Sequence, residues 1–246
     1  MTSYRFSILA TLTLLISIRC TEYGKAVNDK NITVYLNDIQ KSVETLNEDK
    51  GLINEVLSKN TDGREILSVG FPEVIRWNEF QDIIEITVDK SVYVTYGATR
   101  ADFSIGLFQM KPSFVESIEN YLTEYPFLAS KELPKNIVLK NKDEKSNRQI
   151  RIQRLSDTKW QLIYLSVYWL VANHRFKYIR FQNIDQKLKF YASAYNFGFT
   201  KPINQIENWQ KKLLFPHGKN FKGTQVAYGD ISIHFFHLYS PIFFTN

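Results

Sequence analysis

The chain has 246 residues, of which 44% are hydrophobic and 15% aromatic, so it can bury a sizeable core and is not an intrinsically disordered protein. Its formal net charge of +6 suits an anionic surface such as a cell envelope but does not by itself identify a partner. The single cysteine, Cys20, excludes an intrachain disulfide and a metal site built from cysteines.

The N-terminus has the layout of a secretory signal. Residues 1–5 are weakly basic, and residues 6–18 form an uncharged apolar run that ends before Arg19. The run is too short to span a bilayer, which takes about 20 residues. We therefore expect residues 1–20 to be a signal peptide and the mature protein to be exported, either periplasmic or associated with the envelope.

Cys20 has two interpretations. Residues 15–20 resemble the signal box that precedes a lipidated cysteine, which would make Cys20 the lipid anchor of an outer-membrane lipoprotein, although Arg19 stands where a small residue is expected. Ordinary signal cleavage near residues 24–26 would instead remove the cysteine with the leader. Both interpretations stay open.

Helical periodicity begins after the leader. Apolar residues recur at spacings of three and four over residues 34–46 and again over 52–57, which predicts one amphipathic helix, or two separated at Gly51, in an N-terminal helical segment of residues 21–60. A turn then leads into residues 65–86, predicted as a largely buried helix that is interrupted or kinked near Pro72. Residues 91–96 are β-branched and aromatic and predict either a short strand or a segment that links helices.

The second half of the chain is also predicted to be helical. Residues 112–121 form a helix that begins at Pro112, a residue favoured at the first helical position. Residues 159–178 are apolar nearly all round and predict a central helix, and residues 185–195 predict another that stops at Gly198. A helix over residues 203–214 and an apolar segment over 228–239 complete a mainly α domain of residues 61–246, with a small β-hairpin or loop insertion.

Basic residues are concentrated between Lys131 and Arg154. We interpret this stretch as a solvated loop or hairpin insertion and not as a nucleic-acid site, because an exported protein is unlikely to meet nucleic acid. The histidines show no recognisable metal-ligand spacing, so we expect them to be structural and expect neither a metal nor a cofactor. They are His174, His217, His234 and His237.

Two short strings and one glutamate carry the functional signal. The strings are Ser104-Ile-Gly-Leu-Phe-Gln-Met-Lys-Pro112 and Ala194-Tyr-Asn-Phe-Gly198, and both follow Glu73 in its apolar setting Phe71-Pro-Glu-Val74. Over residues 60 to 215 this order resembles the lytic transglycosylases, whose fold is lysozyme-like and related to that of goose-type lysozymes. That family has a catalytic Glu, then Gly-Leu-Met-Gln with a Pro shortly after, then Ala-Tyr-Asn. Each string is weak alone, and their order makes the combination specific.

The resemblance implies cleavage of the β-1,4 bond between N-acetylmuramic acid and N-acetylglucosamine in peptidoglycan strands. Glu73 would first give a proton to the leaving oxygen and then act as base on the 6-hydroxyl of the muramic sugar, which leaves a 1,6-anhydro end. A carboxyl group buried among apolar side chains has a raised pKa, as the first step requires. The sequence around Glu73 predicts such surroundings.

The resemblance also implies a set of substrate-binding residues. Gly106 would allow close approach of a saccharide ring, and Gln109 would hydrogen-bond N-acetyl and hydroxyl groups. Tyr195 would place its hydroxyl on the catalytic carboxyl, and Asn196 would contact the sugar or pin the loop. The full set is Ser104, Gly106, Leu107, Phe108, Gln109, Tyr195 and Asn196.

Departures from the family pattern leave alternatives open for the catalytic residue. Val74 stands where the family usually has Ser, and Phe108 stands in place of Met. The stretch from Glu73 to Gly106 is longer than in the common soluble enzymes, which implies an insertion around residues 82–100. Glu79 and Glu85 are therefore rival candidates, with more polar neighbours than Glu73.

Two other activities compete with the transglycosylase. Asp89 or Asp102 could position a water, which would give a hydrolytic product as in goose-type lysozymes. The missing Ser after Glu73 keeps open a catalytically silent envelope protein that binds glycan or organises a secretion or conjugation machine.

Overall fold

The computed structural model describes residues 31–60, 62–79, 83–129, 133–141 and 143–244. This part of the chain is mainly helical, with ten α-helices and one two-stranded antiparallel sheet, so the predicted mainly α class is confirmed. The expected signal segment, including Cys20, lies outside the described residues. None of the helices in the described ranges combines the length and the apolar character needed to cross a membrane.

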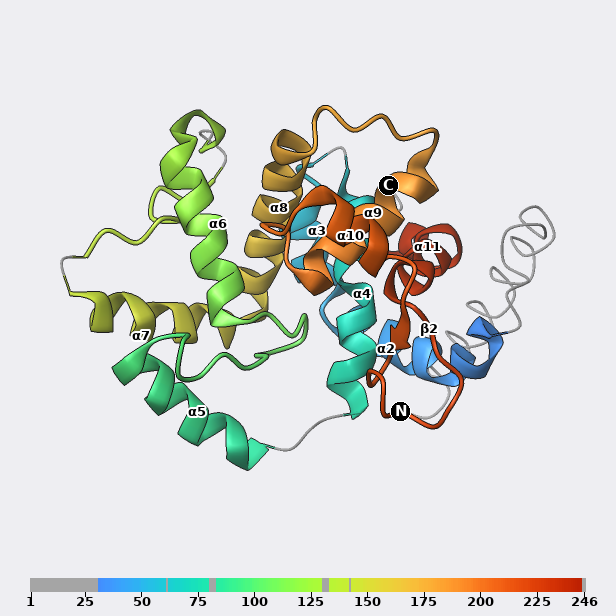
Figure 1. Cartoon of the computed structure of the whole chain (residues 1–246), viewed down its shortest axis with the longest axis horizontal. Coiled ribbons are helices and arrows are strands. Elements are labelled where there is room, and N and C mark those ends of the chain that lie inside the picture. Colours follow the sequence, from blue (N-terminus) through green and yellow to red (C-terminus); the bar gives the residue numbers. More distant parts are fainter. Residues whose placement is uncertain (1–30, 61, 80–82, 130–132, 142, 245–246) are drawn as a thin grey trace.

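Figure 1 shows the order of the elements along the chain. The α-helices are α2 (Leu36–Glu48), α3 (Lys50–Leu57), α4 (Gly63–Glu79), α5 (Ile83–Tyr96), α6 (Pro112–Glu124), α7 (Glu144–Leu155), α8 (Thr158–Arg175), α9 (Ile184–Phe197), α10 (Ile203–Trp209) and α11 (Tyr228–Leu238). The strands are β1 (Leu213–Phe215) and β2 (Val226–Ala227), and the short 3-10 helices are η1 (Ile32–Tyr35), η2 (Pro126–Leu128) and η3 (Ser240–Phe243).

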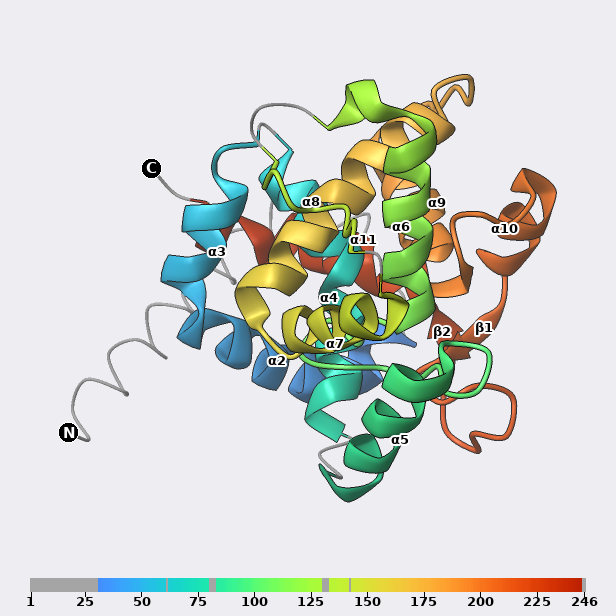
Figure 2. The same cartoon turned by 90° about the vertical axis from the view of Figure 1, so that its left-hand side faces the viewer.

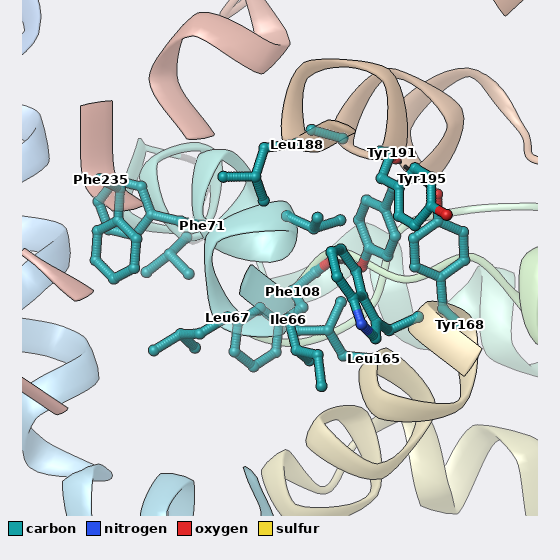
Figure 3. Packing of buried hydrophobic residues seen from close by; sticks show 14 of the residues in the cluster. Ile66, Leu67, Phe71, Phe108, Leu165, Tyr168, Leu188, Tyr191, Tyr195 and Phe235 are labelled. Carbon is teal, nitrogen blue, oxygen red and sulfur yellow. Dashed lines mark hydrogen bonds between the residues drawn. The ribbon is translucent and has the colours of Figure 1, made fainter. Parts of the chain in front are cut away.

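Helix α4 lies at the centre of the fold, and α2, α8, α9 and α11 all pack against it (Figures 1 and 2). It is buried over residues 66–75, which are apolar except for Ser68 and Glu73. Phe71 stacks on Phe235 of α11 with ring centroids 3.9 Å apart, and Figure 3 shows these two rings on the opposite side of α4 from Tyr168 and Tyr195. A polar side chain on α4 is therefore surrounded by residues from several other helices.

The helix predicted over residues 65–86 is divided in the structure. Helix α4 runs through Pro72 to Glu79, and a separate helix, α5, starts at Ile83. Residues 91–96 belong to α5, so neither a strand nor a linking segment forms there. Helix α5 packs against α7 at the edge of the molecule, away from α4 (Figure 1).

The N-terminal segment contributes two helices, α2 and α3, with the break at Asp49 and with Gly51 inside α3. Helix α2 packs on α4, and α3 packs on α8. Their apolar stripes join the same hydrophobic core as the rest of the described chain. These helices therefore help to enclose α4.

The basic stretch is a solvated loop only in part: residues 133–141 are irregular, with Lys135 and Lys140 exposed, whereas the second half of the stretch is helical, which corrects the sequence-based interpretation there. Residues 144–155 form α7, capped by the Asp143 side chain, and two of its arginines are buried. Arg151 binds Glu119 of α6 with an Nη2 to Oε2 distance of 2.9 Å, and Arg154 donates to the carbonyl oxygens of Asn136 and Ile137. Sequence alone could not show this, because the acidic partner and the carbonyls come from other segments.

The small β-hairpin also forms in a different part of the chain from the one predicted. Helix α10 ends at Trp209 instead of Leu214, and residues 213–215 form strand β1, which pairs with β2 in antiparallel orientation. The connection between β1 and β2 approaches α4, where the Pro216 carbonyl oxygen accepts a hydrogen bond from Arg76 Nε at 2.9 Å. The small hairpin thus lies at the central helix and not in the 131–154 stretch.

Candidate functional site

A cleft of about 410 Å³ opens beside the central helix. Glu73 and Arg76 of α4 form one wall, the segment that leads into α6 forms another, and the end of α9 closes the third side. The cleft contains Glu73, Ser104, Gln109, Tyr195 and Asn196, all of which the sequence predicted for one site. The fold therefore brings residues that are far apart in the chain together in one cleft.

Glu73 is 5% exposed and faces this cleft. Asn196 Nδ2 donates to Glu73 Oε1 at 3.2 Å. Arg76, one helical turn further along α4, places its Nη1 3.2 Å from Oε1 and 3.4 Å from Oε2 of the same carboxylate. The predicted burial is thus present, but the surroundings of the carboxylate are not purely apolar, because a guanidinium and an amide both contact it.

Arg76 is itself fixed from the hairpin side. Arg76 Nε donates to the Pro216 carbonyl oxygen. The guanidinium also lies 5.5 Å from the ring centroid of Phe215 and 5.9 Å from that of Tyr228. These partners are supplied by β1 and α11, which are distant from α4 in sequence. Neither Arg76 nor Tyr228 was predicted for the site: the spacing of three between Glu73 and Arg76 on a predicted helix could have indicated Arg76, whereas no local pattern indicates Tyr228.

Asn196 occupies the last turn of α9, which ends at Gly198 as predicted. Its Oδ1 accepts a hydrogen bond from Trp209 Nε1 at 3.0 Å, and the Trp209 ring stacks on Phe197 with centroids 4.5 Å apart. Trp209 was also missed by sequence reasoning. The only indication was an aromatic residue in the short helix that follows the Ala-Tyr-Asn string.

Tyr195 does not place its hydroxyl on Glu73, which corrects the expectation. The hydroxyl donates to the Phe108 carbonyl oxygen at 2.8 Å and so ties α9 to the first string. Burial, with a smaller contribution from the negative charge of Glu73, raises the pKa of Tyr195. The same two causes, in the same order, raise the pKa of Tyr228, so both phenols stay neutral beside the carboxylate.

The first string forms a tight turn between Ile105 and Met110, whose backbones exchange two hydrogen bonds of 3.0 and 3.1 Å. Gly106 has φ +68°, and a Cβ there would lie 1.6 Å from Gln161 Nε2. Gln161 of α8 fills this space and accepts a hydrogen bond from the Phe108 N–H at 2.8 Å. Gly106 is therefore needed for the close approach of Gln161, and not for that of a sugar as the sequence suggested.

The residues of this turn divide between cleft and core. Ser104 and Gln109 line the cleft, whereas Leu107 and Phe108 are buried in the hydrophobic core. Gln109 adopts φ +46°, unusual for a residue with a Cβ, and its Nε2 donates to the Gly106 carbonyl at 2.9 Å. Such backbone strain is found preferentially at functional sites.

Of the other acidic candidates, Asp102 is the one that lines the cleft. Its two carboxylate oxygens accept from the backbone N–H and the hydroxyl of Ser113, at 3.1 and 2.8 Å, and Lys111 lies 3.7 Å away. Asp102 thus stabilises the start of α6. Asp89 is half-buried on α5, and the side chains of Glu79 and Glu85 lie outside the described part of the structure.

The cleft continues into a second hollow of about 690 Å³ along α6, and the two share Ser117 and Thr200. Aromatic side chains line this hollow, and two of them, Phe127 and Tyr178, are 71% and 87% exposed. Exposed rings beside a hollow provide apolar surface for a ligand. The combined groove is therefore longer than the Glu73 cleft alone.

The histidines take structural positions. Within the described ranges, no three His, Cys, Asp or Glu side chains come together in a group that could hold a metal ion. His237 Nε2 lies 2.7 Å from Asp185 Oδ1, and His174 Nδ1 lies 2.9 Å from the Tyr121 hydroxyl. His234 is buried in α11, and neither of its ring nitrogens finds a hydrogen-bond partner among the described residues.

The buried His234 makes the stability of the protein depend on pH. Burial, and secondarily the nearby His237, lowers the pKa of His234 from 6.5 to about 4. The unfolded chain therefore takes up a proton on this residue before the folded protein does, and stability is lost as the pH falls from 6.5 towards 4. We expect a loss of up to about 3 kcal/mol from this residue, measured as the free energy of unfolding in urea.

Replacement of the histidine tests this expectation. The His234→Gln variant should lose that part of the pH dependence between pH 7 and 4.5, whereas His217→Gln, at an exposed position, should retain it. An equal pH dependence in wild type and His234→Gln would show that other groups cause it.

Comparison with known proteins identified no relative. No family model, curated protein or solved structure matches the chain. The functional argument therefore rests on the residues that meet in the cleft.

Proposed function

We propose that the protein is a peptidoglycan lytic transglycosylase with a lysozyme-like fold, which cleaves the β-1,4 bond between N-acetylmuramic acid and N-acetylglucosamine. One observation carries the proposal: in the cleft, the amide of Asn196 contacts the carboxylate of Glu73 at 3.2 Å. The resemblance named these two residues for one site from separate parts of the sequence. The longer groove past Ser117 and Thr200 suits a polymeric substrate.

The reaction needs one carboxyl group in two protonation states. Protonated Glu73 gives its proton to the glycosidic oxygen as the bond from that oxygen to C1 breaks. The ionised carboxylate then takes the proton of the muramic 6-hydroxyl, whose oxygen forms the new bond to C1 and closes the 1,6-anhydro ring. The proton is thus returned to Glu73, and no water is consumed.

Asp102 supports the anhydro product over hydrolysis. Retaining and inverting glycosidases use a second carboxylate as nucleophile or as base for a water. Both oxygens of Asp102 are instead engaged by Ser113 at the start of α6. Ser113 thus holds the Asp102 carboxylate at the start of α6, which favours a structural role for Asp102 over that of a base for water.

The ion pair between Arg76 and Glu73 favours a second candidate function, a silent glycan-binding protein of the envelope. Arg76 Nη1 contacts both oxygens of the Glu73 carboxyl group, and a carboxyl group paired in this way is not free to meet the glycosidic oxygen. Val74, fully buried where the family usually has Ser, points the same way. For the enzyme to act, the pair must open when the glycan enters the cleft.

Removal of the Arg76 charge distinguishes these functions. In an enzyme, Arg76→Met should raise the cleavage rate by about tenfold, because a hydrogen bond to a charged group no longer has to be broken when the glycan enters the cleft. Arg76→Lys, which keeps the charge, should stay close to wild type. The measurement is the rate of product release, and a rate that falls would show that Arg76 is required to hold Glu73.

The cellular setting belongs to the same proposal. The mature protein would be exported to the periplasm or envelope, retained there by a lipid on Cys20 or released by cleavage after it, and would act on glycan strands alone or within an envelope machine. It would need no cofactor.

Product analysis tests the function directly. Purified mature protein is incubated with peptidoglycan, and the soluble products are analysed by mass spectrometry, with Glu73→Gln as the blank. We expect 1,6-anhydro ends. Reducing ends would indicate a lysozyme, and binding without any product would leave the silent glycan-binding protein.

A further inference from the structure

The Asn196 side chain lies between two hydrogen-bond partners that fix the orientation of its amide group. Its Nδ2 donates to Glu73 Oε1, and its Oδ1 accepts from Trp209 Nε1. An indole N–H can only donate, and an ionised carboxylate can only accept. With the amide turned by 180°, nitrogen would face the indole donor and oxygen would face the carboxylate, so both hydrogen bonds would be lost.

The indole is itself held in place. The Trp209 ring lies nearly parallel to Phe197, with an interplanar angle of 17°, and α10 packs on α9. Phe197 directly follows Asn196 in the chain, so one short piece of α9 carries both the amide and the surface that orients its donor. Trp209 is not among the residues that line the cleft, and it reaches the site through Asn196.

We infer that Trp209 is a positioning residue of the Glu73 site. Its indole N–H holds the Asn196 amide with the nitrogen towards Glu73, and that nitrogen in turn orients the carboxylate in the cleft. The catalytic consequence rests on the proposed function. The orientation of the amide does not, and it can be tested separately.

The stacking on Phe197 must be separated from the hydrogen bond. Trp209→Phe removes the N–H and part of the stacked surface. Site-specific incorporation of β-(3-benzothienyl)alanine at position 209 replaces the N–H by sulfur and keeps the size of the ring system. Trp169→Phe is the matched control, because it removes an indole hydrogen bond of 2.8 Å to Asp62, whose acceptor is not in the cleft.

The first measurement does not depend on activity. In ¹H–¹⁵N spectra of the full mature chain, the two Asn196 Nδ2 protons should give separate, sharp signals in wild type and in Trp169→Phe. In Trp209→Phe and in the benzothienylalanine protein both signals should shift towards the positions of a solvent-exposed asparagine amide, because the amide is no longer held between two fixed partners; they stay separate because rotation about the amide C–N bond is slow. Unchanged Asn196 signals in both position-209 proteins would overturn the inference.

The second measurement is cleavage of soluble glycan strands. Both position-209 proteins should lose about tenfold in kcat, with KM within about twofold of wild type, because Trp209 does not line the cleft. A wild-type kcat for the benzothienylalanine protein would show that stacking alone matters and would refute the role of the N–H. If wild type cleaves nothing, the proposed function fails, while the spectra still decide the amide orientation.

Discussion

Replacement of Glu73 by Gln should abolish most of the glycan-cleaving activity and leave the fold intact. Gln has nearly the same shape, and its side-chain oxygen can still accept from Arg76 and Asn196, which contact the carboxylate in the wild type. It cannot give or take the proton. Acid–base catalysis typically contributes about 10²- to 10⁴-fold, and Glu73 is proposed to act in both steps, so we expect a loss in that range.

The rate of release of anhydro-muropeptides measures this effect. Glu55→Gln is the matched control, because Glu55 is exposed and pairs with Lys159 on the surface. Glu73→Asp should fall between wild type and Glu73→Gln, since it keeps the acid but withdraws it from the cleft. Wild-type activity in Glu73→Gln would refute the assignment and direct attention to Glu79 and Glu85.

Replacement of Arg151 by Met should destabilise the protein far more than removal of a charge from an exposed ion pair. Glu119 is 3% exposed, and its Oε2 accepts hydrogen bonds from Arg151 Nε and Nη2 at 3.1 and 2.9 Å. Without the guanidinium, Glu119 stays buried with one hydrogen bond left among the described residues, from the Tyr164 hydroxyl 3.3 Å away. Removal of one member of a buried ion pair typically costs about 3–5 kcal/mol, a large share of the stability of a domain.

Urea unfolding of a mutant cycle separates the lost pair from the stranded charge. Arg151→Met combined with Glu119→Leu should recover much of the loss, because no unpaired charge then remains in the core. Lys159→Met, at the exposed pair with Glu55, should change stability by less than about 1 kcal/mol. An Arg151→Met variant as stable as Lys159→Met would show that the pair between α6 and α7 contributes little.

The pH dependence of the Arg151→Met variant gives a further check. Burial already raises the pKa of Glu119, while Arg151 opposes that rise. Without Arg151 the folded protein should hold a proton on Glu119 to higher pH than the unfolded chain does. The deficit in stability should therefore shrink as the pH is lowered towards the ordinary pKa of a glutamate.

Local sequence signals predicted several elements well. Pro112 begins α6, Gly198 ends α9, and the apolar run over residues 159–178 forms the buried helix α8. Each of these depends on interactions within a few residues: a fixed φ, a helix stop or an apolar periodicity. The boundary error at Trp209 occurs where α10 gives way to β1, a strand that forms only by pairing with β2.

Partners from distant segments were beyond the reach of the sequence. Residues 144–155 look solvated because they are basic, yet Arg151 and Arg154 are buried by acceptors from α6 and from residues 136–137. Tyr195 was expected on Glu73, and its hydroxyl instead meets the Phe108 carbonyl. Polar side chains are paired by geometry, and one sequence does not state which donor will face which acceptor.

For this protein, the sequence by itself determined the mainly α class and named Glu73, Gln109 and Asn196, because local periodicity and short strings carry that information. Only the tertiary structure decided how those residues are used. It placed Asn196 against Glu73, fixed Arg76 through the Pro216 carbonyl oxygen of the hairpin, and directed the Trp209 N–H to the Asn196 amide oxygen. These contacts join segments that are remote in the chain, and they form only when α4, α9, α10 and the hairpin pack together.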